Sequence, residues 1–274
     1  MRTATTLLKG IALLLTASIF FACKKNKTAP PAATLVKQWQ LTLNTAFENP
    51  APAGRTETGT ATVELYDDNS LKYQITVNSL AAGDALTAAH IHWGDPVTNG
   101  PVIVNFSPVF TNNAASGTLT GLRQTLIDSL QTGATYVNVH STQLPGGLVR
   151  AQMDKTMDFA ITVALNGANE VPANTSTATG VALIRLMSDK TLYSKVTVTN
   201  LEANDTLTAA HIHTAATGVN GPVLQGLCAA DTDFGVNKNF ALDDAKVTSV
   251  KTAAVYVNVH SKRKPAGIIR GQIR

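Results

Sequence analysis

A long internal repeat constrains this chain more than any other feature of its sequence. The stretch Leu86–His92 (LTAAHIH) recurs in the same order as Leu207–His213, at an offset of 121 residues. Further along, Tyr136–Ser141 (YVNVHS) recurs as Tyr256–Ser261, at an offset of 120 residues. Solenoid repeats are shorter, about 20 to 50 residues each. A long unit written twice therefore predicts two tandem domains of similar structure.

Both copies end in the same way, and this match places the domain boundaries. A proline, a glycine, an arginine and a glutamine follow the last histidine of each copy at the same spacing. We therefore expect a first domain over residues 36–154 and a second over residues 155–274. The closing residues are Pro145, Gly147, Arg150 and Gln152 in the first copy, and Pro265, Gly267, Arg270 and Gln272 in the second.

The segment before the first copy has the pattern of an export signal. Arg2 and Lys9 give it a positive start, and an apolar run follows from Ile11 to Phe21. This order predicts a signal peptide over residues 1–22. The apolar run is shorter than the roughly 20 residues that a membrane-spanning helix needs.

The end of that segment (FFAC, ending at Cys23) resembles a bacterial lipobox. The resemblance implies that Cys23 becomes the lipidated N-terminus. The lysines of residues 24–27 and the prolines Pro30 and Pro31 predict that residues 23–35 form a short solvated tether. We therefore expect a protein of the cell envelope, anchored through its lipid to the periplasmic face of a membrane or to the outer membrane or cell surface.

The distribution of charge argues against nucleic acid as a partner. Of the 22 lysines and arginines, five precede residue 28, where no acidic residue occurs, so 17 basic residues face 18 acidic ones in the remainder. A balanced domain lacks the basic stripe that follows a phosphate backbone.

Once Cys23 carries lipid, Cys228 has no partner for an internal disulfide, and we expect it to be a small core residue.

Strand periodicity dominates both copies. Phe159, Ile161, Val163 and Leu165 alternate with smaller or polar residues, as in a half-buried antiparallel strand. Turn-forming residues interrupt such runs about every ten residues, a rhythm typical of sandwiches and barrels. Only residues 122–130, and their counterpart 242–250, favour a short helix.

The chain has six histidines, and all six lie in the repeated blocks. A strand places residues i and i+2 on one face, so the two histidines of the block AHIH project together while the isoleucine between them faces the core. If the later strand lies beside this one, its histidine joins them. Three imidazoles are a sufficient ligand set for zinc or copper with an open position. The candidate ligands are His90, His92 and His140, and His211, His213 and His260.

Two other interpretations of the histidines remain open. Duplication copies histidines whether or not they bind a metal, and imidazoles at strand ends also hydrogen-bond backbone carbonyls. Histidine also titrates near neutral pH, which suits a proton-linked role or contact with a partner.

The ordered blocks resemble the CHRD domain, a family named for the animal protein chordin and also found in bacterial secreted proteins. In the second copy the blocks are Leu165–Pro172 (LNGANEVP), Ala210–His213 followed by Asn220–Val223, and Tyr256–Gln272. The first copy departs from the pattern at Asn44–Pro50 (NTAFENP). The resemblance implies all-β architecture, with two tandem antiparallel β-sandwiches of immunoglobulin-like form, distantly similar to Cu/Zn superoxide dismutase. It implies no established activity.

The dismutase similarity suggests a copper site on the histidines with an arginine that guides superoxide. Arg270 is the candidate arginine in the second copy. No histidine is left over for a bridging position or a zinc loop, and the disulfide is missing. A dismutase-like redox enzyme is therefore the weakest of the functions considered.

Four further residues lie in the histidine blocks or on the strands that close each copy, and they are candidates for supporting the site. We expect each arginine to form a fork with a carboxylate of the opening block, Glu48 or Glu170. The four residues are Asn138, Arg150, Asn258 and Arg270.

Three functions follow from the sequence. The first is a non-enzymatic binding module with a protein or glycan ligand. The second is binding or buffering of copper or zinc by a three-histidine site in each domain, and the third is the redox enzyme. No nucleophile motif occurs, and no catalytic residue is assigned.

Overall fold

The computed structural model describes Met1 and residues 31–274. The expected signal peptide, Cys23 and most of the expected tether lie outside the described residues. Within residues 31–274, none of the helices has the length and apolar character that crossing a bilayer requires.

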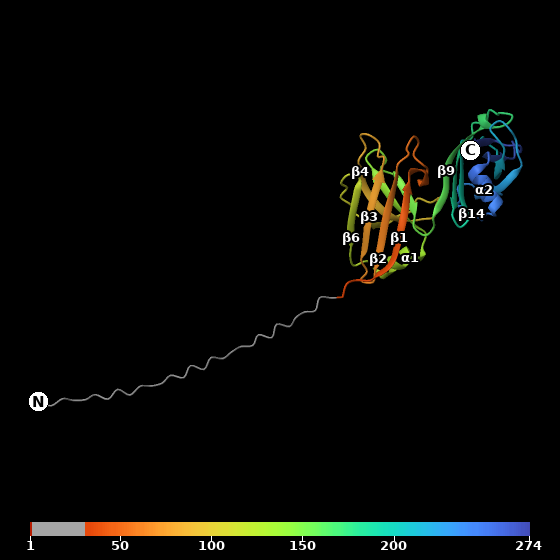
Figure 1. The fold of residues 1–274 in the computed structure, drawn as a ribbon. Helices are drawn as coiled ribbons and strands as arrows, with labels where there is room; N and C mark the ends of the chain where they lie inside the picture. Colours follow the sequence, from red (N-terminus) through yellow and green to blue (C-terminus); the bar gives the residue numbers. More distant parts are fainter. Residues whose placement is uncertain (2–30) are drawn as a thin grey trace. The chain divides into compact units, whose positions relative to one another are not determined.

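The first domain is one antiparallel sheet of eight strands in the order β5-β4-β7-β8-β1-β2-β3-β6 (Figure 1). A 3-10 turn, η1 (Thr45–Phe47), follows the first strand, and a helix, α1 (Gln124–Thr132), precedes β7. The strands are β1 (Leu35–Asn44), β2 (Thr58–Tyr66), β3 (Leu71–Asn78), β4 (Leu86–Trp93), β5 (Val102–Asn105), β6 (Ala114–Leu119), β7 (Thr135–Ser141) and β8 (Val149–Gln152).

The second domain repeats this topology, with the order β13-β12-β15-β16-β9-β10-β11-β14. Its helical elements are η2 (Gly167–Asn169), η3 (Asp231–Asp233) and α2 (Asp244–Thr252). The strands are β9 (Met157–Asn166), β10 (Thr179–Met187), β11 (Thr191–Thr199), β12 (Leu207–Thr214), β13 (Val223–Cys228), β14 (Lys238–Ala241), β15 (Val255–Ser261) and β16 (Ile269–Gln272). The prediction of two tandem all-β domains is confirmed.

Each sheet is almost divided where β8 meets β1, or β16 meets β9. There a single residue pair joins the strands, Asn44 with Arg150 in the first domain and Asn166 with Arg270 in the second. Side chains of both halves belong to one buried cluster, for example Leu43 and Ile75 with Ile91 and Val149. Each domain is therefore sandwich-like, with two four-stranded layers over a common core.

The strand and helix patterns of the sequence match these elements closely. In β2 every second residue is buried, which is the period that burying one face of a strand requires. The two predicted helices are present but begin two residues later, because Leu122 and Leu242 still donate backbone hydrogen bonds to neighbouring loops, to Asn69 and Lys190. Cys228 is buried as expected, at 5 % exposure.

Candidate metal centre

Strand pairing brings the three histidines of each domain together. In the first domain β4 pairs with β7, so His90 lies opposite Asn138 and His92 opposite Tyr136. His140 lies two residues beyond Asn138, on the same face of β7. Ile91 between the two histidines is fully buried in the core, and the histidines occupy the other face. The pairing of β12 with β15 places the three histidines of the second domain in the same register.

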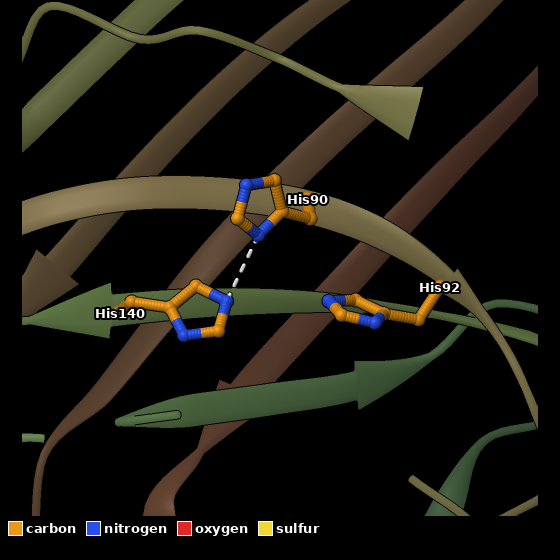
Figure 2. A group of neighbouring side chains, drawn as sticks. All are labelled: His90, His92 and His140. Carbon is orange, nitrogen blue, oxygen red and sulfur yellow. Dashed lines mark hydrogen bonds between the residues drawn. The ribbon is translucent and has the colours of Figure 1, made fainter. Parts of the chain in front are cut away.

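In both domains the imidazoles converge closely enough to share an ion. One nitrogen from each of the three histidines lies within 4.8 Å of the other two. Figure 2 shows His90 and His140 joined by a hydrogen bond of 3.0 Å, with the ring of His92 directed toward them. Zinc–nitrogen bonds of about 2.1 Å separate tetrahedral ligand atoms by about 3.4 Å, so a metal would change the distances between these nitrogens by at most about 1.4 Å.

Backbone carbonyls determine which nitrogen of each ring is free. The Nδ1 atom of His92 lies 2.9 Å from the carbonyl of Gly100, and that of His140 lies 3.0 Å from the carbonyl of Pro145. A carbonyl only accepts, so Nδ1 carries the proton and Nε2 keeps its lone pair. Metal-binding histidines are commonly held in this way by a hydrogen bond at their other nitrogen.

The second domain has the same arrangement. His213 is bound by the carbonyl of Gly221 at 2.9 Å and His260 by that of Pro265 at 3.0 Å. The Nε2 atoms of both rings and Nδ1 of His211 are buried and have no hydrogen-bond partner. Three buried nitrogens without partners at one point are what a metal site without its ion presents.

The two clusters differ in one hydrogen bond. In the first domain Nε2 of His140 has a lone pair, so it accepts a hydrogen bond from the Nδ1–H of His90. In the second domain the equivalent His211 makes no such bond. A metal that binds Nδ1 of His90 must displace the proton that makes this hydrogen bond. In the second cluster no such hydrogen bond has to be replaced.

Burial favours the neutral form of His90, His92, His140 and His211. Desolvation, followed by the neighbouring His140 and His92, lowers the pKa of His90 to about 4. Desolvation also lowers the pKa of His92, His140 and His211. Neutral imidazole is the form that binds a metal, so these rings are ready to act as ligands at neutral pH.

A three-layer stack supports one ligand in each domain. The ring of Tyr136 lies parallel to that of His92, 4.9 Å away, and the guanidinium of Arg150 covers its other face at 3.4 Å. In the second domain Tyr256 stacks on His213 at 4.9 Å and carries Arg270 at 3.3 Å. The histidine ring is thus held by an aromatic face as well as by a carbonyl.

One glycine joins the stack to the carbonyl. Gly100 donates its N–H to the hydroxyl of Tyr136 at 3.2 Å and accepts from His92 through its carbonyl. A Cβ at this position would lie 1.5 Å from the carbonyl oxygen of Trp93, so only glycine fits. Gly221 makes the same contacts with Tyr256 and His213. This requirement explains why the block NGPV recurs.

The expected fork between arginine and glutamate is wrong. Arg150 donates instead to the carbonyls of Thr98 and Asp95 and to the side chain of Asn99, and it lies on Tyr136. Among residues 31–274 no ion pair joins either arginine to Glu48 or Glu170. Carbonyl groups and an aromatic face satisfy the guanidinium, so no carboxylate is required.

Both glutamates are held by the asparagines that are candidates for supporting the site. Asn138 donates to Glu48 at 2.6 Å, and Asn258 donates to Glu170 at 3.1 Å. Burial raises the pKa of each carboxyl group to about 7, although the nearby arginine opposes the shift. Of the candidate supporting residues, the arginines thus connect to the histidines through the tyrosines, whereas the asparagines bind the glutamates.

Sequence reasoning missed the tyrosines and glycines as parts of the site. Tyr136, Tyr256, Gly100 and Gly221 all lie inside the repeated blocks. Their repetition was the available signal, but it does not distinguish a ligand support from a packing residue.

By its fold and its two histidine clusters, the chain belongs to a class of tandem β-sandwich proteins with three histidines gathered in each domain. The family model of the CHRD domain matches residues 39–153 and again residues 161–273. The chain therefore belongs to the CHRD domain family, in two tandem copies. No curated protein and no solved structure matches it.

Proposed function

We propose that this protein is an exported, lipid-anchored metal-binding protein of the cell envelope that holds one copper or zinc ion in each domain. One observation carries the metal proposal. In both domains three imidazoles direct nitrogens toward one point, with the other nitrogen of two of them held by a backbone carbonyl. The described residues offer no comparably specific set of contacts for a protein or glycan ligand.

The ligand set suits a borderline metal ion. Three neutral imidazoles, without a thiolate or carboxylate in the cluster, favour copper and zinc over calcium or magnesium, which prefer oxygen ligands. Three protein ligands leave a coordination position open. Sequestration or buffering of the ion in the envelope is the function that such a site serves without a further catalytic group.

The redox alternative is weaker than the metal-binding one. An arginine that guides an anion to a metal must be exposed beside it. Arg150 and Arg270 are 0 % and 2 % exposed and lie beneath tyrosine rings. Neither is available to attract superoxide, so we do not propose dismutation.

Metal analysis of the protein purified without a histidine tag tests the metal proposal. After dialysis against zinc or copper, about two equivalents are expected per chain, one for each three-ligand site. Changing His92 and His140 to alanine in the first domain removes about one equivalent, and changing His213 and His260 removes the other. Circular dichroism confirms that each variant is folded. A folded wild-type protein that retains no ion after reconstitution would contradict the proposal.

The anchor is tested separately. In cells that express the full chain, a radiolabelled fatty acid is incorporated into the protein, and globomycin leads to accumulation of the unprocessed form. The variant Cys23→Ser abolishes the label. A labelled Cys23→Ser protein would show that the lipid is attached elsewhere.

A further inference from the structure

The second domain has an open pocket against the outer edge of its histidine cluster. The pocket has a volume of about 590 Å³ and lies within this domain, between β12, β13, η3 and β14. Its wall includes His211 and Lys238 as polar groups and Phe240, Leu227 and Cys228 as apolar ones. Nothing in the metal-binding proposal uses this space.

Two substitutions between the copies distinguish this region from its counterpart. Gly226 pairs with His211, whereas Asn105 pairs with His90 and carries a side chain on the same face. Lys238 pairs with Ser194 in β11, whereas the equivalent pair of the first domain is Gly117 with Tyr73. The second domain therefore has open space and a cation where the first has the amide of Asn105 and a glycine that lies against the side chain of Tyr73.

The edge of the His211 ring that faces Gly226 carries a hydrogen-bond donor when the cluster holds a metal ion. A Cβ built on Gly226 would lie 4.0 Å from Cδ2 of His211, the carbon bonded to Nε2. The other nitrogen, Nδ1, faces the cluster and has no partner. When a metal occupies Nδ1, the ring proton must reside on Nε2, at the edge toward the pocket.

The remaining polar groups also favour an acceptor as the ligand. The carboxylate of Asp233 is occupied, because it pairs with Lys238 and accepts from the backbone of Ala229 and Ala230. Lys238 retains further N–H donors. Burial raises the pKa of the Cys228 thiol to about 12, so this wall of the pocket stays uncharged.

We infer that this pocket binds a small organic carboxylate, with its charged group accepting from His211 and Lys238 and its apolar part against Phe240 and Leu227. Through His211 the carboxylate and the metal of the second domain strengthen each other's binding. The pocket itself does not depend on the metal, whereas this coupling rests on the proposed function. Coupling between two sites is reciprocal, so it is measurable from either ligand.

Fluorine NMR of 4-fluorobenzoate with the mature chain tests the inference, with and without zinc. We expect binding at one site per chain, with zinc increasing the affinity about 5-fold or more, the lower end of typical coupling between sites. Gly226→Asn imitates the first domain and fills the pocket, and Lys238→Met removes the cation. Each lowers the affinity at least about tenfold, the equivalent of about 1.4 kcal/mol. Ser116→Ala, in β6, the strand of the first domain that corresponds to β14, leaves it unchanged.

The outcomes separate the two proposals. Equal binding of fluorobenzene, which lacks the carboxylate, overturns carboxylate recognition, and so does a zinc-loaded wild-type protein that does not bind 4-fluorobenzoate. Affinity that is the same with and without bound zinc overturns the coupling. If zinc does not bind but 4-fluorobenzoate does, and Lys238→Met or a folded Gly226→Asn loses it, the pocket stands and the metal proposal fails. Melting temperature and zinc content establish that the variants are folded.

Discussion

At the scale of single residues, Tyr136 connects a candidate ligand to a buried charge. Its ring separates His92 from Arg150, and its hydroxyl accepts from Gly100, the residue whose carbonyl orients His92. The tyrosine thus fixes the histidine ring by two routes, through its face and through the glycine. Such outer contacts typically change metal affinity about 10- to 100-fold when they are removed.

The variant Tyr136→Phe tests this connection. It keeps the stacked ring but removes the hydroxyl, so we expect zinc affinity of the first domain to fall by about tenfold, at the lower end of that range. Competition with a chromophoric chelator measures the affinity. Tyr73→Phe is the matched control, because the Tyr73 hydroxyl donates to the carbonyl of Phe106 in the same domain, outside the cluster. Equal effects of the two variants would contradict a specific role.

The buried carboxyl group of Glu48 makes stability depend on pH. Burial raises its pKa from 4.5 to about 7. Between these two pH values the folded state therefore holds a proton that the unfolded state has already released. Its contribution to stability is therefore full below pH 4.5 and is lost as the pH rises through 7.

We expect Glu48→Gln to remove this loss. Its melting temperature should decline less than that of the wild type between pH 5 and pH 8, as measured by thermal denaturation of the metal-free protein. Glu64→Gln, at a hydrogen-bonded but less buried position in β2, should follow the wild-type profile. A wild-type profile for Glu48→Gln would show that the carboxyl group is ionised throughout this range.

At the scale of elements, the loop between β4 and β5 positions a ligand by coming close to the end of β4. Gly100 lies so close to Trp93 that no side chain fits between them, and its carbonyl reaches His92 as a result. The loop is thus as much a part of the candidate centre as the strand that carries the histidines.

Gly100→Ala should displace this loop and disrupt one site. We expect bound zinc to fall from about two equivalents to about one, since the second domain keeps its own loop at Gly221. Gly146→Ala is the matched control, because a Cβ there meets no atom within 4 Å and the backbone is not in the left-handed region. Full zinc content in a folded Gly100→Ala protein would disprove the loop's role.

At the scale of the whole molecule, the two clusters are similar but not equivalent. The hydrogen bond between His90 and His140 must be broken before the first cluster takes a metal, whereas the second has no such bond to lose. A typical intramolecular hydrogen bond contributes about 0.5 to 1.5 kcal/mol, which corresponds to about a 2- to 10-fold difference in affinity.

We therefore expect the second domain to fill first in a zinc titration followed by calorimetry. The variant His92→Ala with His140→Ala keeps the tighter site, and His213→Ala with His260→Ala keeps the weaker one. Metal also raises the melting temperature, because a ligand that binds only the folded state stabilises it, by about 2.7 kcal/mol at 100 times Kd. A chelator reverses this increase. Identical affinities in the two variants would contradict the order of filling.

Local patterns were enough to predict most of the architecture. The repeat predicted two similar domains, the period of two predicted their strands, and the spacing in AHIH placed both histidines off the core face that Ile91 and Val137 occupy. These features depend on the alternation of side chains along one strand, which the sequence contains directly.

The contacts of the site depended on residues far apart in the chain. Which nitrogen of His92 is free is decided by the carbonyl of Gly100, and Arg150 prefers a tyrosine face and loop carbonyls to Glu48. Likewise, the pocket beside His211 exists because Gly226 lies opposite it on the neighbouring strand β13. The pairing register and the paths of the loops determine these distances, and neither is contained in the period of a single strand. The sequence therefore identified the histidines, and the tertiary structure decided how they are oriented and what lies beside them.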